Sequence, residues 1–139
     1  MTTIRLGGKE FVLVIDTGSS DTWVASTNFQ CEHRLTRMRI PLSRCNIGAL
    51  YEESSPSLIP LPGRNFSVAY TDGEFLSGML ASETVEVGGL RARQAIGVVE
   101  KGWWIGDGRS SGLMGLAYPL LVDGGRTREG NYSSIVFSL

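Results

Sequence analysis

The hydrophobic and polar positions of this chain form short runs of two kinds, and both predict β-strands. Some runs alternate apolar and polar side chains, as in strands with one buried face, and others are apolar throughout, as in strands inside a core. Glycine pairs and the Asp72-Gly73 dipeptide stand between runs and favour tight hairpin turns. The predicted strands are residues 3–7, 11–15, 66–70, 75–87, 94–100 and 111–119, with a further extended segment at 23–25.

Two stretches between these runs have no strand pattern. Residues 31–45 carry four arginines and are bounded by Cys31 and Cys45, which predicts a charged surface loop. The two cysteines could close that loop as one disulfide, or both could be free. Residues 46–64 contain prolines at 56, 60 and 62 and are expected to form an irregular connection.

Composition indicates one globular, all-β domain. The 139 residues are 42% hydrophobic and 19% charged, and the 18 glycines fit a chain with many turns. The net charge of −1 gives no reason to expect nucleic acid or a membrane as a partner, and no apolar run reaches membrane-spanning length. The first ten residues lack the apolar centre of a signal peptide, so we expect either a cytosolic protein or a chain that has lost its start.

The histidine and cysteine content limits the possible chemistry. His33 is the only histidine and stands in a charged stretch, so a Ser-His-Asp or Cys-His enzyme would have no other base. Two cysteines and one histidine also fall short of the four ligands of a structural zinc site. We therefore expect no metal and no cofactor.

One carboxylate stands in a distinctive position. The apolar run 11–15 ends abruptly at Asp16, which is followed by Thr17, Gly18 and Ser19. This pattern delivers a carboxylate to the end of a buried strand, where two hydroxyls and nearby backbone amides can hold it in its ionised form. Taken alone, these four residues are more typical of a polar turn between two strands.

Three longer segments change that interpretation. Residues 11–24, FVLVIDTGSSDTWV, resemble the first active-site motif of the pepsin-like aspartic proteases. Residues 70–78, YTDGEFLSG, resemble the flap hairpin of that family. Residues 111–119, SGLMGLAYP, resemble the apolar, glycine-containing strand that lies beside the catalytic loop in that family. The three occur in the family's order. The resemblance implies an all-β, pepsin-like acid protease fold in which residues 1–139 form part of the amino-terminal lobe of a bilobal enzyme, with the carboxy-terminal lobe absent.

The resemblance also implies roles for individual residues. Asp16 would be one of two catalytic carboxylates, within the active-site loop that Thr17, Gly18 and Ser19 continue. Tyr70 would be the flap tyrosine and would accept a hydrogen bond from the Trp23 indole, a pairing suited to a cleft wall. The flap and substrate cleft would comprise Tyr70, Thr71, Asp72, Gly73, Trp23, Trp104 and Leu113.

The match to the family is less direct at Trp104 and Ser111. Trp104 could equally be a core residue. Ser111 stands where the family usually has Asp; because that position is not catalytic, we expect only a local change in hydrogen bonding. A helix of the family is expected to begin within residues 120–139.

The second catalytic carboxylate is missing from the chain. Asp21, Asp72, Asp107 and Asp123 are not followed by Thr-Gly or Ser-Gly. We therefore expect this chain alone to be inactive and to need a carboxy-terminal lobe to act on peptide or protein substrates. The alternatives are a non-catalytic module that binds a peptide or protein, and a homodimeric, retroviral-type protease that uses two copies of Asp16.

The resemblance implies secretion or an acidic vacuolar compartment. The two cysteines give this expectation minor support. Two N-glycosylation sequons, Asn65-Phe66-Ser67 and Asn131-Tyr132-Ser133, give it weak support, because such triplets also occur by chance.

Overall fold

The computed structural model describes residues 1–116, and its regular structure is almost entirely β. This confirms the expected fold class. The helix expected within 120–139 and the last residues of the strand expected at 111–119 lie outside the described residues. The elements are β1 (Thr2–Leu6), β2 (Lys9–Asp16), β3 (Thr22–Cys31), the 3₁₀ helix η1 (Leu42–Arg44), β4 (Ile59–Ala69), β5 (Phe75–Val87), β6 (Leu90–Trp103) and β7 (Gly112–Gly115).

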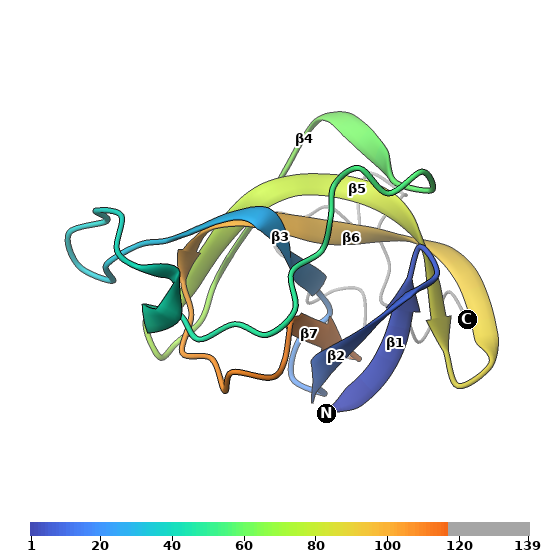
Figure 1. Ribbon diagram of the computed structural model, residues 1–139, viewed down its shortest axis with the longest axis horizontal. Coiled ribbons are helices and arrows are strands. Elements are labelled where there is room, and N and C mark those ends of the chain that lie inside the picture. The colour runs from blue at the N-terminus through green and yellow to red at the C-terminus, as the bar shows by residue number, and fades with distance from the viewer. Residues whose placement is uncertain (117–139) are drawn as a thin grey trace.

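The strands close into a barrel. They follow the order β1-β2-β7-β3-β6-β5-β4, and a further pairing of β1 with β5 joins the ends of the ring and leaves β4 outside it. β2 pairs with β7 and β3 with β6 in parallel, whereas the other pairings are antiparallel. In Figure 1 the long strands β5 and β6 curve together over the top of the barrel, and β4 lies outside β5. This is the architecture expected of one pepsin-like lobe.

The interior holds two apolar clusters, and strand alternation explains how they form. Phe66 and Val68 of β4 point inward while Asn65 and Ser67 are exposed, because successive side chains of a strand face opposite sides. One cluster is centred on Trp23 and includes Phe29, Phe66, Leu76, Leu80, Trp104 and Leu113. The other includes Ile4, Leu13, Tyr51, Val85, Ile96 and Met114.

Strand β7 passes close to the backbones of its neighbours because it carries glycine where they approach. A side chain at Gly112 would place its Cβ 2.0 Å from the carbonyl oxygen of Trp23. At Gly115 the Cβ would lie 2.6 Å from the carbonyl oxygen of Ser19. Both contacts are with backbone atoms, which cannot rotate away, so these positions admit only glycine.

The expectation of an irregular connection at 46–64 was partly wrong. Residues 46–58 lie outside the named strands, but Ile59–Arg64 form the first part of β4. Proline is tolerated there because β4 is the outer strand of the described sheet, where a missing N–H need not break a ladder. The register shifts between Pro60 and Asn65, so the proline-containing half pairs with β5 separately from the regular half.

A buried carboxylate fastens the connection before β4 to the barrel. Glu83 of β5 has no exposed surface and accepts hydrogen bonds from the hydroxyls of Tyr51, Ser55 and Ser57 and from the Thr84 amide, the last at 2.7 Å. Burial opposes ionisation of Glu83, but these donors outweigh it and lower the pKa of the carboxyl below its usual value. The connection is therefore held by a charged group that stays ionised in mild acid.

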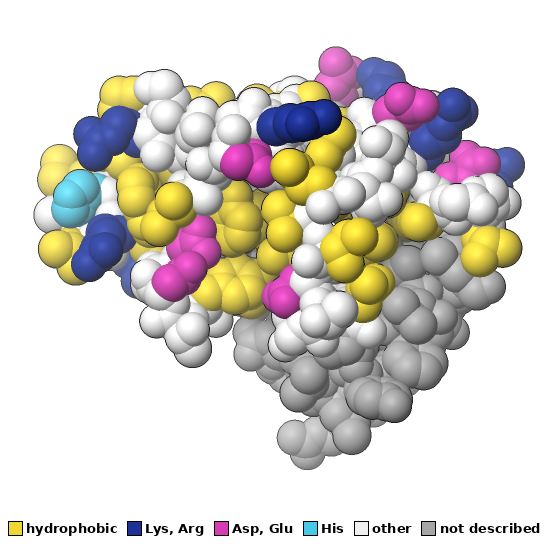
Figure 2. Space-filling model, turned by 90° about the horizontal axis from the view of Figure 1, so that it is seen from below, with side chains coloured by type: hydrophobic (Ala, Val, Ile, Leu, Met, Phe, Trp, Pro, Cys, Tyr) yellow, Lys and Arg dark blue, Asp and Glu magenta, His cyan; other side chains and the backbone are white. Residues whose placement is uncertain are grey.

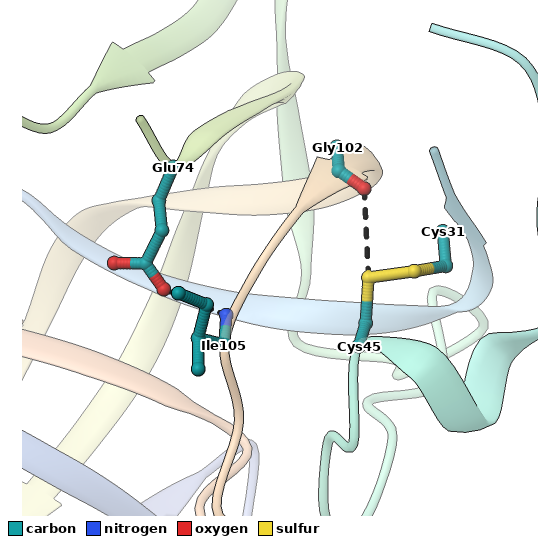
Figure 3. Close-up of a disulfide and its surroundings, with 5 residues drawn as sticks. All are labelled: Cys31, Cys45, Glu74, Gly102 and Ile105. Atoms are coloured by element: carbon teal, nitrogen blue, oxygen red, sulfur yellow. Dashed lines mark hydrogen bonds between the residues drawn. A yellow bond between two sulfur atoms is a disulfide. The ribbon is translucent and has the colours of Figure 1, made fainter. Parts of the chain in front are cut away.

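The two cysteines form a disulfide, which settles the choice left open by the sequence. Cys31 ends β3 and Cys45 follows η1, and both are buried. Figure 3 shows Cys45 Sγ beside the backbone of Gly102 in β6, 3.6 Å from its carbonyl oxygen. The crosslink thus anchors the arginine-rich loop at the end of the β3–β6 pair.

Removing the crosslink should destabilise the fold. In the full-length protein, we expect the combined Cys31→Ala and Cys45→Ala changes to lower the free energy of unfolding by about 3 kcal/mol, because the unfolded chain regains the entropy of a loop of about 15 residues. Chemical denaturation followed by intrinsic fluorescence measures this. Leu42→Ala, an exposed position within the same loop, should change stability by less than about 0.5 kcal/mol. An unchanged midpoint in the double variant would contradict the stabilising role.

Candidate active site

Asp16 lies at the carboxyl end of β2, where the sequence pattern placed it. Its Oδ1 accepts a hydrogen bond from the Gly18 amide at 2.9 Å, and its Oδ2 accepts one from the Ser19 hydroxyl at 2.8 Å. The Asp16 carbonyl oxygen accepts the Leu116 amide at 2.9 Å, directly after β7. Both carboxylate oxygens and the backbone of Asp16 are therefore fixed by the loop that follows it and by the neighbouring strand.

The loop that holds Asp16 is open to solvent. Thr17 and Gly18 are exposed, and Asp16 and Ser19 are half-buried. A Cβ at position 18 would lie 3.3 Å from Asp16 Oδ1, so glycine allows the amide to approach the carboxylate closely. The carboxylate is held rigidly and remains accessible, as a reacting group requires.

An aromatic group lies beside this loop. The Trp23 indole N–H donates to the Tyr70 hydroxyl at 3.1 Å, which is the hydrogen bond implied by the resemblance. Trp104 packs edge-on against Trp23 with ring centroids 4.9 Å apart, and its centroid lies 5.9 Å from that of Tyr70. Trp104 is 8% exposed, so it packs in the core and also contacts Tyr70.

Tyr70 is electrostatically coupled to the carboxylates of the site. Burial raises the pKa of its phenol to about 12, the Trp23 N–H opposes that shift, and the charges of Asp21 and Asp16 add to it. The hydroxyl of Tyr70 therefore stays protonated throughout the physiological range and can both accept from Trp23 and donate to another group.

The flap is a tight turn at the tip of the β4–β5 hairpin. Its backbone closes through hydrogen bonds from the Tyr70 amide to the Glu74 carbonyl at 2.8 Å and from the Gly73 amide to the Tyr70 carbonyl at 3.1 Å. Gly73 adopts φ +94°, a conformation that glycine takes without strain. Thr71, Asp72 and Gly73 are exposed at the tip.

The base of the flap carries a buried acid that the sequence gave no reason to single out. Glu74 is 6% exposed, and its Oε2 accepts the Ile105 amide at 2.7 Å (Figure 3). Burial and the neighbouring Asp72 carboxylate raise the pKa of Glu74 to about 7, while the Ile105 N–H partly opposes them. The hydrogen bond to Glu74 lowers the pKa of Asp72. The two acids therefore share one proton in mildly acidic solution, with Glu74 as donor and Asp72 as acceptor.

The flap also contacts the disulfide loop. The guanidinium of Arg37 lies over the Phe75 ring, 3.4 Å from its centroid, in a cation–π contact. Arg37 itself has φ +62°, a left-handed backbone conformation that is uncommon for a residue other than glycine. Figure 2 shows basic side chains gathered at the end of the molecule that carries this loop, beside a face with exposed hydrophobic and acidic side chains.

Leu113 and Ser111, both near β7, are buried. Leu113 is 5% exposed and packs in the same cluster as Trp23 and Trp104, beneath the site rather than on an open surface. Ser111 is also buried, and its hydroxyl has no hydrogen-bond partner among the described residues. Ser111 therefore adds no side-chain hydrogen bond to the described residues around it.

The described residues contain no cluster of three or more histidine, cysteine, aspartate or glutamate side chains that could hold a metal ion. Within residues 1–116, none of the helical structure has the length and apolar character needed to cross a membrane.

A β-barrel lobe with Asp-Thr-Gly-Ser at a strand end, under a hairpin whose tyrosine bonds a core indole, is the arrangement of a pepsin-like aspartic protease. The family described as eukaryotic aspartyl protease matches residues 1–136, and the chain belongs to that family.

Fungal relatives are similar over most of this chain. It is 40% identical to a probable aspartic-type endopeptidase of Aspergillus fumigatus over 87% of its length, 38% identical to penicillopepsin-3 of Penicillium janthinellum over 85%, and 34% identical to rhizopuspepsin of Rhizopus chinensis over 86%. These alignments cover 27%, 27% and 28% of the respective relatives. The chain therefore spans about a quarter of the length of the relatives it matches.

Replacing Glu74 tests the shared proton. A group whose pKa is raised by folding stabilises the protein at pH values below its unfolded pKa of 4.5, and this contribution is lost as pH rises through about 7. Glu74→Gln keeps an oxygen for the Ile105 amide and adds an N–H for Asp72, and so mimics the protonated acid. At about pH 8 we expect the full-length variant to exceed wild type by up to about 3 kcal/mol in the free energy of unfolding.

Denaturation curves recorded from about pH 4 to pH 8 measure this difference. At about pH 4 the variant and wild type should be equally stable. Glu10→Gln, an exposed carboxylate on β2, should leave the pH profile as it is in wild type. A Glu74→Gln profile parallel to wild type over the whole range would show that Glu74 does not retain a proton.

Proposed function

We propose that the full-length protein is an aspartic endopeptidase and that this chain forms its amino-terminal lobe. Asp16 supplies one of two carboxylates, and the carboxy-terminal lobe supplies the other. The observation that carries the proposal is the carboxylate of Asp16, which is fixed through both oxygens and remains half-exposed at the end of β2.

The chemistry requires the second carboxylate. Two carboxylates about 3 Å apart cannot both ionise, so they share one proton. The ionised partner takes a proton from a water molecule held between them, and the protonated partner polarises the scissile carbonyl and later supplies the proton that the leaving nitrogen needs. The pair titrates as a unit, usually in the acidic range.

The geometry around Asp16 suits this role. Each of its oxygens accepts one hydrogen bond within the loop, and an ionised carboxylate has about four lone-pair positions in all. The positions left over are available for the water and the second carboxylate. The Gly18 and Ser19 donors also fix the orientation of the carboxylate.

The substrate would be a peptide or protein bound between the Asp16 loop and the flap. Tyr70 supplies an apolar ring face there, which favours apolar side chains near the cleaved bond. Trp23 is fully buried, so it supports Tyr70 from the core together with Trp104 and does not line the cleft as expected from the resemblance. A buried disulfide supports passage through an oxidising compartment and hence secretion or an acidic vacuolar location. Neither a metal nor a cofactor takes part in the proposed reaction.

Loss of the Asp16 carboxylate should abolish peptide cleavage. In the full-length protein, we expect Asp16→Asn to lower kcat by at least about 100-fold at acidic pH, because an amide can neither act as a base nor share the proton. Cleavage of a peptide with apolar residues at its centre measures this. Glu10→Gln, on the same strand, should retain activity within about twofold. Full activity in Asp16→Asn would overturn the proposal, and an inactive wild type with intact folding would favour a non-catalytic binding module.

The chain by itself should not cleave peptides. Purified residues 1–139 are expected to show no activity at any concentration, because only one carboxylate is available. If two copies formed the active site instead, activity would rise with roughly the square of chain concentration at low concentration and disappear in Asp16→Asn. Such concentration dependence would replace the bilobal proposal with the homodimeric one.

A further inference from the structure

A polar hollow lies on the outer face of the barrel, at the end where β3, β4, β5 and β6 run side by side. Its volume is about 580 Å³. The lining alternates hydrogen-bonding groups of every kind: amides, hydroxyls, a carboxyl and an ammonium group. The polar side chains that line it include Asn28, Asn65, Ser67, Ser77, Glu100 and Lys101.

Strand register explains why these groups share one face. Ser67 of β4 is paired with Ser77 of β5, and Ser77 is paired with Lys101 of β6. Residues directly opposite one another in a sheet project to the same side, so the three form a row across three strands. Asn65 stands two positions before Ser67 and therefore projects to the same side as well.

Asn65 and Ser67 belong to the sequon Asn65-Phe66-Ser67. The middle residue, Phe66, is fully buried in the core, and the asparagine and serine on either side of it are exposed. The strand thus anchors the triplet through its centre and presents both of its functional side chains to solvent. Because β4 is the outer strand of the described sheet, no described strand lies beyond it to obstruct a large substituent.

We propose that Asn65 carries an N-linked glycan whose first sugars lie in this hollow. The donor is a polyprenyl-diphosphate-linked oligosaccharide of the secretory pathway. The Asn65 amide nitrogen bonds to the anomeric carbon of the donor, the bond from that carbon to the phosphate oxygen breaks, and the polyprenyl diphosphate leaves with the electron pair while the amide proton passes to a base of the transferase. This inference rests on the secretory location given under the proposed function.

The lining of the hollow suits a sugar. Sugar hydroxyls both donate and accept hydrogen bonds, and the hollow offers the Lys101 ammonium as donor, the Glu100 carboxyl, and the Ser77 hydroxyl, which can do either. A glycan attached at the rim reaches these groups without losing the entropy of a free ligand.

A glycan at Asn65 would protect the edge of the sheet from pairing with other chains. A free strand edge invites pairing with another chain, and proteins blunt such edges with proline, charge or bulges. The first half of β4 has Pro60, Pro62 and a register break, whereas its second half, residues 65–69, has neither proline nor charge. The sequon lies in the unprotected half, where a bulky hydrated glycan keeps other strands away.

Site mapping tests the modification directly. The full-length protein, made in a eukaryotic host behind a signal peptide, is treated with peptide-N-glycosidase in H₂¹⁸O, which turns each occupied asparagine into labelled aspartate. We expect the label at Asn65, in an Asn131→Gln background as well. Asn65→Gln and Ser67→Ala should remove it, and Ser67→Thr, which keeps the sequon, should retain it. An unlabelled Asn65 in secreted wild-type protein and in Ser67→Thr would overturn the proposal.

Light scattering tests the role at the edge. Native wild-type protein stripped of glycan, and the Ser67→Ala variant, should self-associate severalfold faster than glycosylated protein. Ser67→Lys, which lacks the sequon but places a charge on the edge, should remain monomeric. Equal association rates in all four proteins would overturn the edge role. Peptidase activity is measured on the same samples. An active protein without a glycan on Asn65 would refute the glycan proposal alone. An inactive protein with a glycan on Asn65 would refute the proposed function alone.

Discussion

The close approach of β7 to β2 and β3 is the constraint on which the site depends. Strand β7 lies between the strand that ends in Asp16 and the strand that begins beside Trp23, and it can do so because Gly112 and Gly115 leave room for neighbouring carbonyls. This approach fixes the distance between the Asp16 loop and the Trp23 indole. Any larger side chain at either glycine would push the two apart and change the site without touching its polar groups.

From the central indole, contacts continue outward to the flap. Trp104 packs on Trp23, Tyr70 bonds to Trp23, and farther along the hairpin Phe75 receives the guanidinium of Arg37. The Arg37 loop is in turn tied to the barrel by the disulfide. The hairpin is therefore supported from the core on one side and from a surface loop on the other, so its resting position depends on both.

The sequence predicted the elements whose signals are local. The run ending at Asp16, the hairpin turn at Asp72-Gly73 and the glycine strand at 111–119 each showed their periodicity or turn chemistry directly, and the family resemblance supplied the partner of Tyr70. The strand pattern at Ile59–Arg64 was obscured because prolines usually mark a break, and only the outer position of β4 makes them acceptable. The roles of Glu74 and Arg37 could not be predicted, because their partners Ile105 and Phe75 lie 31 and 38 positions away and are joined to them only by the fold.

Folding shifts the pKa values of two buried glutamates in this lobe in opposite directions. Glu83 is held ionised by its donors, so its contribution to stability is lost as pH falls below the usual range of a carboxyl group. Glu74 is held protonated by burial and by Asp72, so its contribution fades as pH rises toward about 7. Between these limits both groups favour the folded state. The lobe therefore carries, in Glu83 and Glu74, a preference for a mildly acidic medium that does not involve the Asp16 carboxylate. Substitutions at these two positions would shift that preference while the sequence of the Asp16 loop stays the same.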